Sequence, residues 1–152
     1  MTPDDGAPDP GIVVENVHGA RTLDPAALET LVAYAADAEG FAIRYLGIVL
    51  MDHAGVHALN RDFLGHDWET DVVSFPLGEA DERVVDGEVY VDLDTAAERA
   101  AEFETTFEDE ARRYVVHGLL HLMGYDDATD DERAAMRALE DQYLTQPGPG
   151  AA

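Results

Sequence analysis

Two histidines and an aspartate in the C-terminal third of the chain have the types and spacing of a metal site. His117 and His121 are four residues apart, so on a helix they lie on one face, one turn from each other. Gly124 lies on the same stripe and can end the helix in the left-handed conformation. Beyond that turn, Asp127 can swing back toward both imidazoles. Two ligands on a helix and a third after a glycine reversal predict a three-ligand, open zinc site.

The same spacing occurs in a group of peptidases, with one difference. Metzincin peptidases have the arrangement His-x3-His-x2-Gly-x2-ligand, and their general-base glutamate directly follows the first histidine. Gly118 occupies that position here, so the peptidase mechanism lacks its proton acceptor. The structural alternatives are a metal that only holds the fold, or two buried histidines that are satisfied by hydrogen bonds.

A second histidine pair shows how little the spacing alone indicates. His53 and His57 are also four residues apart, near the start of an ordinary amphipathic helix with Gly55 between them. No third ligand follows at a suitable distance, so we interpret this pair as surface histidines. The helix of His117 is apolar almost all round, which is typical of a buried helix, and this context favours a metal there.

Three sequence blocks resemble the YbeY family of endoribonucleases. The segment HGLLHLMGYDD at 117–127 is similar to the family signature HGxLHLxGYDH. Upstream, Leu59-Asn60 and TDVVSFP at 70–76 resemble the family's LN and TDVLSFP, and GEVYV at 87–91 resembles its GDIxI strand. The blocks follow the family's order over roughly residues 41–144, and this combination is far more specific than any single block.

The resemblance implies a zinc-dependent endoribonuclease that acts on single-stranded RNA. It also implies roles in maturing the 3′ end of small-subunit ribosomal RNA and in ribosome quality control. The expected partners are ribosomal RNA and the small ribosomal subunit or its proteins, with neither DNA nor a membrane. We expect metal-assisted phosphodiester hydrolysis, with water or an RNA 2′-hydroxyl as the attacking group. Two other classes stay open: a metzincin-like metallopeptidase, and a non-catalytic ribosome-associated module whose metal is structural.

The first departure from the family concerns the third ligand. The family has histidine where Asp127 stands, and the neighbouring Asp126 competes for the role; we prefer Asp127 because it occupies the motif position. A carboxylate lowers the positive charge of the centre by about one unit, so bound water should be harder to ionise. We expect one Zn²⁺ ion. Because oxygen is a harder ligand than imidazole nitrogen, Mn²⁺ or Mg²⁺ is an alternative ion for the same site.

The second departure concerns an arginine that many family members carry a few residues after Leu-Asn. Leu64 stands at the matching position here. Arg113 lies four residues before His117 on the same helix stripe, so it could contact a phosphate near the metal. Pairing with a carboxylate near the start of its own helix is the alternative. Arg61 and His66, which flank the position of Leu64, are rival candidates.

Strand and helix patterns alternate around these residues. Strands are expected at 11–17, 41–51, 72–77 and 87–92, and helices, caps included, at 24–38, 52–63, 95–104, 108–123 and 130–144. The 41–51 strand is apolar nearly throughout, which indicates an interior strand. We expect one α+β domain over 11–144, with a small mixed sheet packed with helices and the metal site at the end of a buried central helix. Residues 1–10 and 145–152 are expected to be disordered.

The composition favours an acidic, cytoplasmic enzyme or binding domain. The 152 residues include 33 acidic and nine basic residues, all nine of them arginine, for a formal net charge of −24. Cysteine is absent, which excludes disulfide scaffolds and thiolate ligands, and we expect neither a transmembrane helix nor a secretory signal, because no apolar run is long enough for the former and the first ten residues lack a basic and an apolar region. Such a charge normally opposes nucleic-acid binding, but concentrated salt screens the repulsion. We therefore interpret the charge as adaptation to salt.

Overall fold

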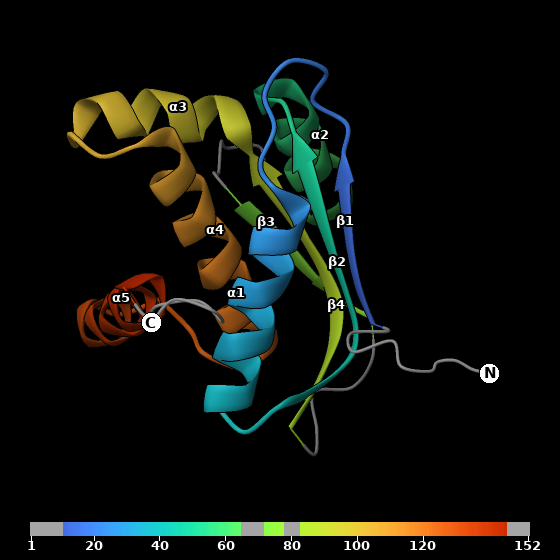
Figure 1. Ribbon diagram of the computed structural model, residues 1–152, viewed down its shortest axis with the longest axis vertical. Helices are drawn as coiled ribbons and strands as arrows, with labels where there is room; N and C mark the ends of the chain where they lie inside the picture. The colour runs from blue at the N-terminus through green and yellow to red at the C-terminus, as the bar shows by residue number, and fades with distance from the viewer. Residues whose placement is uncertain (1–10, 65–71, 78–82, 146–152) are drawn as a thin grey trace.

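The computed structural model describes residues 11–64, 72–77 and 83–145, which form one α+β domain. In chain order its elements are β1 (Ile12–Asn16), α1 (Pro25–Ala38), β2 (Ala42–Met51), α2 (His53–Leu64), β3 (Val72–Pro76), β4 (Val84–Asp92), α3 (Leu93–Glu102), α4 (Phe107–Leu122) and α5 (Asp130–Thr145) (Figure 1). The strands form a mixed sheet in the order β1-β2-β4-β3. β1, β2 and β4 run parallel, and β3 pairs antiparallel with β4. The α+β class and the interior position of the second strand are confirmed.

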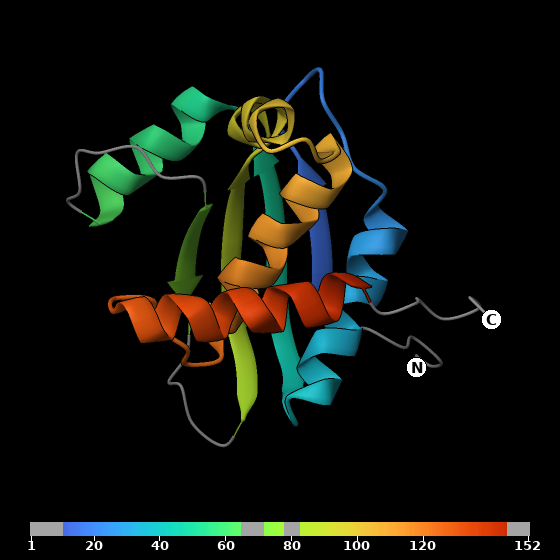
Figure 2. The same ribbon diagram turned by 90° about the vertical axis from the view of Figure 1, so that its left-hand side faces the viewer.

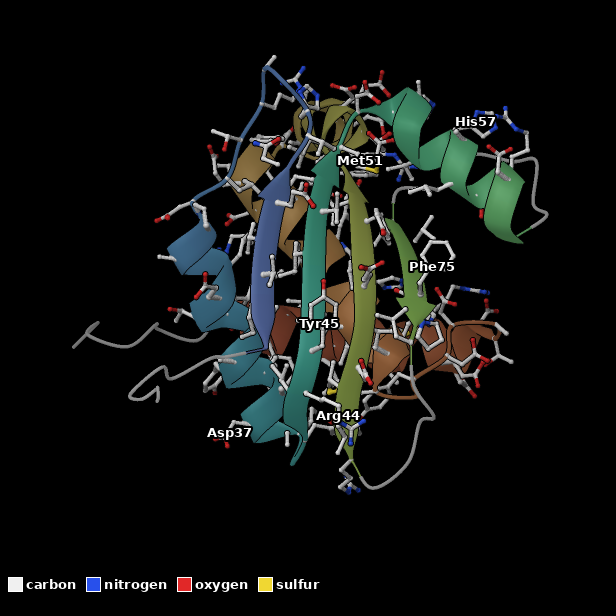
Figure 3. The ribbon with its side chains drawn as sticks, turned by 90° about the vertical axis from the view of Figure 1, so that its right-hand side faces the viewer. Asp37, Arg44, Tyr45, Met51, His57 and Phe75 are labelled. Atoms are coloured by element: carbon white, nitrogen blue, oxygen red, sulfur yellow. The ribbon has the colours of Figure 1, made fainter. Side chains whose placement is uncertain are left out.

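Helices α1 and α4 cover one face of this sheet, and α5 lies across α4 on the side away from the sheet (Figures 1 and 2). Leu46, Ile48 and Leu50 alternate along β2 and are fully buried, as expected where one strand face lies on a core. Val115, Val116, Leu119 and Leu120 of α4 are equally buried. Figure 3 shows the opposite face, from which Tyr45 projects and which these helices leave uncovered. The expected buried central helix is therefore α4, which Figure 2 shows between the sheet and α5.

Capping signals in the sequence determine where α4 begins. The Thr106 hydroxyl accepts a hydrogen bond from the Asp109 N–H at 3.0 Å, and three acidic residues stand in the first turn. Both features stabilise a helix N-terminus, because they satisfy free N–H groups and oppose the helix dipole. At the other end, Gly124 follows the cap residue with φ +103°, the conformation expected of it.

Gly118 allows α4 to lie directly on β3 and β4. A Cβ at this position would stand 2.5 Å from Val89 Cγ1 and 3.2 Å from Ser74 Oγ. The Ser74 hydroxyl also donates to the Gly118 carbonyl at 3.1 Å. A glutamate here would point into the sheet, so the position that carries the general base in metzincins has no room for one.

Substituting Gly118→Ala should therefore destabilise the protein by about 1–3 kcal/mol, because overpacking outweighs the better helix propensity of alanine. Gly55→Ala in α2 is the matched control. Its Cβ would meet the flexible end of Met51 at 2.8 Å, which can move aside. Chemical denaturation of both variants measures the difference. A Gly118→Ala protein as stable as the wild type would show that the close contact is not needed.

Several element boundaries differ from the sequence-based expectation. β4 begins at Val84 rather than 87, because its first residues pair with the start of β2. α3 begins at Leu93 rather than 95, since the Asp92 side chain accepts from the Thr95 N–H at 2.8 Å. α5 includes Thr145, so the expected disordered tail at 145–152 is wrong at its first residue. Residues 1–10 and 146–152 lie outside the described part of the chain. Among the described helices, none is long and apolar enough to span a membrane.

Candidate metal centre

His117, His121 and Asp127 converge at the C-terminal end of α4. The two Nε2 atoms are 3.1 Å apart, and the Asp127 carboxylate oxygens lie 3.3 Å from that of His117 and 3.5 Å from that of His121. Three donors on a tetrahedral zinc ion, with bonds of 2.0–2.1 Å, are about 3.3–3.4 Å apart. All three side chains are between one quarter and two fifths exposed, so a further position can be reached from solvent. The three donors fit a divalent ion with an open coordination position.

In the described parts of the chain, this is the one cluster of three or more metal-ligating side chains. Asp126, the competing ligand, is not part of it; its carboxylate accepts from the Asp127 N–H at 2.8 Å. The turn that delivers Asp127 is well supported. The Gly124 N–H bonds the His121 carbonyl and the Tyr125 N–H bonds the Leu120 carbonyl, each at 3.0 Å, which is the pattern of a Schellman motif.

A second anchor ties this turn to the rest of the domain. The Tyr125 hydroxyl donates to Glu39 at the end of α1, at 2.6 Å. Tyr143 of α5 donates to the other oxygen of the same carboxylate. Burial and the bond to Glu39 raise the pKa of Tyr143 well above its ordinary value, so its hydroxyl keeps its proton. The segment that carries Asp127 is therefore fixed by α1 and α5 together.

Glu140 of α5 is a residue that we did not predict from the sequence. The residue is 4% exposed, and its carboxylate accepts from His117 Nδ1 at 2.7 Å. The proton of the His117 ring is thus held on Nδ1, which leaves the Nε2 lone pair for a metal. A signal was present, because Glu140 falls on the same buried stripe of α5 as Met136 and Tyr143. An acid on an apolar stripe indicates a buried partner.

Arg113 lies beside the centre, and α5 carboxylates hold its guanidinium. Its Nη1 donates to Glu140 at 2.9 Å and its Nη2 to Asp141 at 2.6 Å. Burial lowers the pKa of Arg113, but the bonds to Asp141 and Glu140 outweigh this and raise it, so the group stays charged. Pairing at the start of its own helix is wrong for Arg113, because its guanidinium binds Glu140 and Asp141 of α5 instead. A phosphate contact by Arg113 stays a prediction.

The second histidine pair is held to the domain by a hydrogen bond to Asp92. His53 Nδ1 donates to the fully buried carboxylate of Asp92 at 2.6 Å, and the rings of His53 and His57 are 6.3 Å apart. Both residues are partly exposed, with the side chain of His53 38% exposed, and neither belongs to the metal cluster found among the described residues.

The candidates near the position of the family arginine are only partly described. Arg61 of α2 is exposed and donates to Asp62 at 3.0 Å. Leu64 is the last residue of α2, and His66 lies outside the described residues.

Comparison with known proteins identifies the family. The family model described as endoribonuclease YbeY matches residues 15–148. A Salinibacter ruber protein named endoribonuclease YbeY is 49% identical over 95% of this chain and 97% of its own. A Chlorobaculum tepidum protein of the same name is 42% identical over 82% of this chain and 89% of its own.

A solved structure has the same fold. The solution structure of TM1509 from Thermotoga maritima matches with a TM-score of 0.62 and 32% identity, over 88% of this chain and 86% of that protein. The matched family region contains β2 to α5, hence every residue of the candidate metal centre. From this match and from its close relatives, the chain belongs to the endoribonuclease YbeY family.

Proposed function

We propose that this protein is a metal-dependent endoribonuclease that cleaves single-stranded RNA. We place it in the maturation of the small-subunit ribosomal RNA 3′ end and in ribosome quality control. Membership of an endoribonuclease family supports RNA cleavage and rRNA processing in general. The observation that carries the metal-dependent part is the convergence of two imidazole nitrogens, 3.1 Å apart, with one carboxylate, whose oxygens lie 3.3 Å from the first nitrogen and 3.5 Å from the second.

His117, His121 and Asp127 would hold the ion, with Zn²⁺ as our first choice and Mn²⁺ or Mg²⁺ as alternatives for this mixed nitrogen and oxygen set. A bound divalent ion supplies a Lewis acid for a phosphoryl oxygen and lowers the pKa of water. The chain's own residues orient the ligands. Glu140 holds the proton of His117 on Nδ1, and Arg113 balances the charge of that buried carboxylate.

A peptidase is the weaker alternative, because Gly118 faces the sheet and offers no base beside the ligands. We test the proposal with a labelled single-stranded RNA, a duplex of the same sequence and casein as substrates. We expect the single strand to be cleaved, EDTA to stop cleavage, and added Zn²⁺, Mn²⁺ or Mg²⁺ to restore it. Cleavage of casein instead of RNA, or RNA cleavage that EDTA leaves unchanged, would contradict the proposal.

Circular dichroism under the same chelation separates an enzyme from a structural metal module. If the metal mainly held the fold, EDTA would unfold the protein, whereas a catalytic centre should lose activity before structure. We further propose that the protein works in the cytoplasm with the small ribosomal subunit or its proteins. Pull-down of small-subunit proteins from lysate would test this.

Salt should raise RNA cleavage, in contrast to a basic nuclease. A net charge of −24 repels RNA at low ionic strength, and added ions screen that repulsion. We expect the cleavage rate, or the stability of the fold, to increase with KCl into the molar range. The measurement is a KCl titration of initial rate and melting temperature. A steady decline of both from low salt upward would contradict adaptation to salt.

A further inference from the structure

A cleft of about 710 Å³ runs from the metal centre along α4, with α3 and α5 on either side. Figures 1 and 2 show these two helices flanking α4. His117 and Asp127 line one end of the cleft, and Phe103 and Thr105, from the turn between α3 and α4, line another part. Asp109 and His117 are eight residues apart on α4, which corresponds to about 12 Å. Stacked nucleotides of one strand are about 3.4 Å apart, so about three would fit along this length.

Two arginines of this cleft have no counter-ion. Arg99 of α3 and Arg137 of α5 are exposed, and within the described structure their side chains make no ion pair, hydrogen bond or ring contact. This is unusual in a chain with 33 acidic and nine basic residues. Arg133, which also lines the cleft, is bound to Asp130 and to two backbone carbonyls.

The acids that line the cleft do not neutralise these two arginines. Asp109 is bound to Arg112, and Glu140 is bound to Arg113 and His117. Two further acids complete the lining: Glu110, which is 9% exposed, and the candidate ligand Asp127. The cationic groups left available in the cleft are therefore Arg99 and Arg137.

An exposed aromatic ring stands in the same cleft. Phe103 is 61% exposed, the highest value among the large apolar residues that the structure describes. It directly follows α3, four residues after Arg99. Cationic groups for the backbone and an aromatic face for a base are the combination by which proteins bind single-stranded nucleic acid.

We infer that this cleft is the binding channel for the single strand, with Arg99 and Arg137 on phosphates and Phe103 stacked on a base. The inference rests on the proposed function and specifies where the substrate lies. An acidic protein segment is the other partner that free arginines could attract. Binding of an acidic protein segment would leave the exposed ring of Phe103 and the metal centre at the end of the cleft without a role. RNA is therefore favoured.

Binding of a fluorescein-labelled 12-nucleotide RNA, followed by anisotropy in EDTA, tests the channel without cleavage. Phe103→Ala should weaken binding roughly tenfold, and Phe103→Trp should restore it, because a base stacks on any aromatic face. Leu77→Ala is the control, since Leu77 is 58% exposed and does not line the cleft. Each variant's melting temperature should match the wild type, because the changed side chains are exposed.

The dependence of RNA affinity on salt concentration tests the two arginines. Each phosphate contact in a single strand contributes about −0.7 to the slope of log Kobs against log salt. Arg99→Gln and Arg137→Gln should each shift that slope by about 0.7 toward positive values. Arg44→Gln makes the same change of charge on another side of the molecule, where Figure 3 shows Arg44, and should not shift it by this amount.

Two outcomes would overturn the channel while leaving the proposed function intact. In the first, the wild type cleaves single-stranded RNA but the cleft variants bind the 12-mer like the wild type. In the second, polyglutamate displaces the RNA as well as unlabelled RNA does, and Phe103→Ala has no effect, which would indicate a protein partner. A wild type that cleaves no RNA under any metal would instead contradict the proposed function itself. Cleavage of a dinucleotide should be equal in Phe103→Ala and the wild type, because the inference places the ring on a base away from the cleaved bond.

Discussion

Replacing His121 with alanine should abolish metal binding and RNA cleavage together. The substitution removes one of three donors, and the remaining imidazole and carboxylate cannot fix a divalent ion on their own. Changes around a ligand reduce metal affinity 10–100-fold, so losing the ligand itself should reduce it by more than about 100-fold. Metal content after gel filtration and cleavage of a labelled single strand measure the two effects.

The control for this experiment is His57→Ala. His57 is also a half-buried helical histidine, but it lies outside the candidate centre. It should keep both metal and activity. If a metal-free His121→Ala protein cleaves RNA at the wild-type rate, the metal-dependent mechanism is wrong.

Glu140→Gln should have the second largest effect. Glutamine keeps the shape of the side chain but removes the negative charge that holds the His117 ring, and it leaves Arg113 with one carboxylate partner. We expect metal affinity to fall 10–100-fold, with a parallel loss of activity. The free energy of unfolding should fall by about 1–3 kcal/mol, the penalty typical of a buried group that loses its partner. Competition with a chromophoric zinc chelator measures the affinity.

Asp141→Asn separates the contact of these two acids with Arg113 from the contact of Glu140 with His117. Asp141 holds the other nitrogen of Arg113 at 2.6 Å, and the described structure shows no contact between Asp141 and His117. Its substitution should leave metal affinity near the wild-type value. Equal affinities for the Glu140→Gln and Asp141→Asn proteins would show that Glu140 does not position the ligand.

The sequence was sufficient to predict the features that depend on neighbouring residues. The spacing of His117 and His121 fixes a shared helix face, and Gly124 adopts the positive φ that a helix reversal requires. Asp127 rather than Asp126 joins the cluster, as its motif position predicts. The apolar segments also gave the interior strand and the buried helix, because hydrophobic pattern determines which element is covered.

The features that the sequence did not predict depend on contacts between distant elements. Glu140 reaches His117 across 23 residues, and the partners of Arg113 also come from α5. The burial of Gly118 against Val89 depends on how α4 is placed on the sheet. A local pattern can mark Glu140 as an acid on an apolar stripe, but it does not identify His117 as the partner, so the support of the metal centre becomes visible only in three dimensions.

The candidate ligands and the side chains that orient them come from different, successive parts of the chain. All three candidate ligands lie within residues 117–127, whereas Glu140 and Tyr143 belong to α5 at 130–145. Because a ribosome releases a chain from its N-terminus, the ligands emerge before the helix that orients them. Ordering of the candidate centre therefore requires α5 to be docked on α4, because that helix supplies the carboxylate that orients His117 and the tyrosine that anchors Glu39.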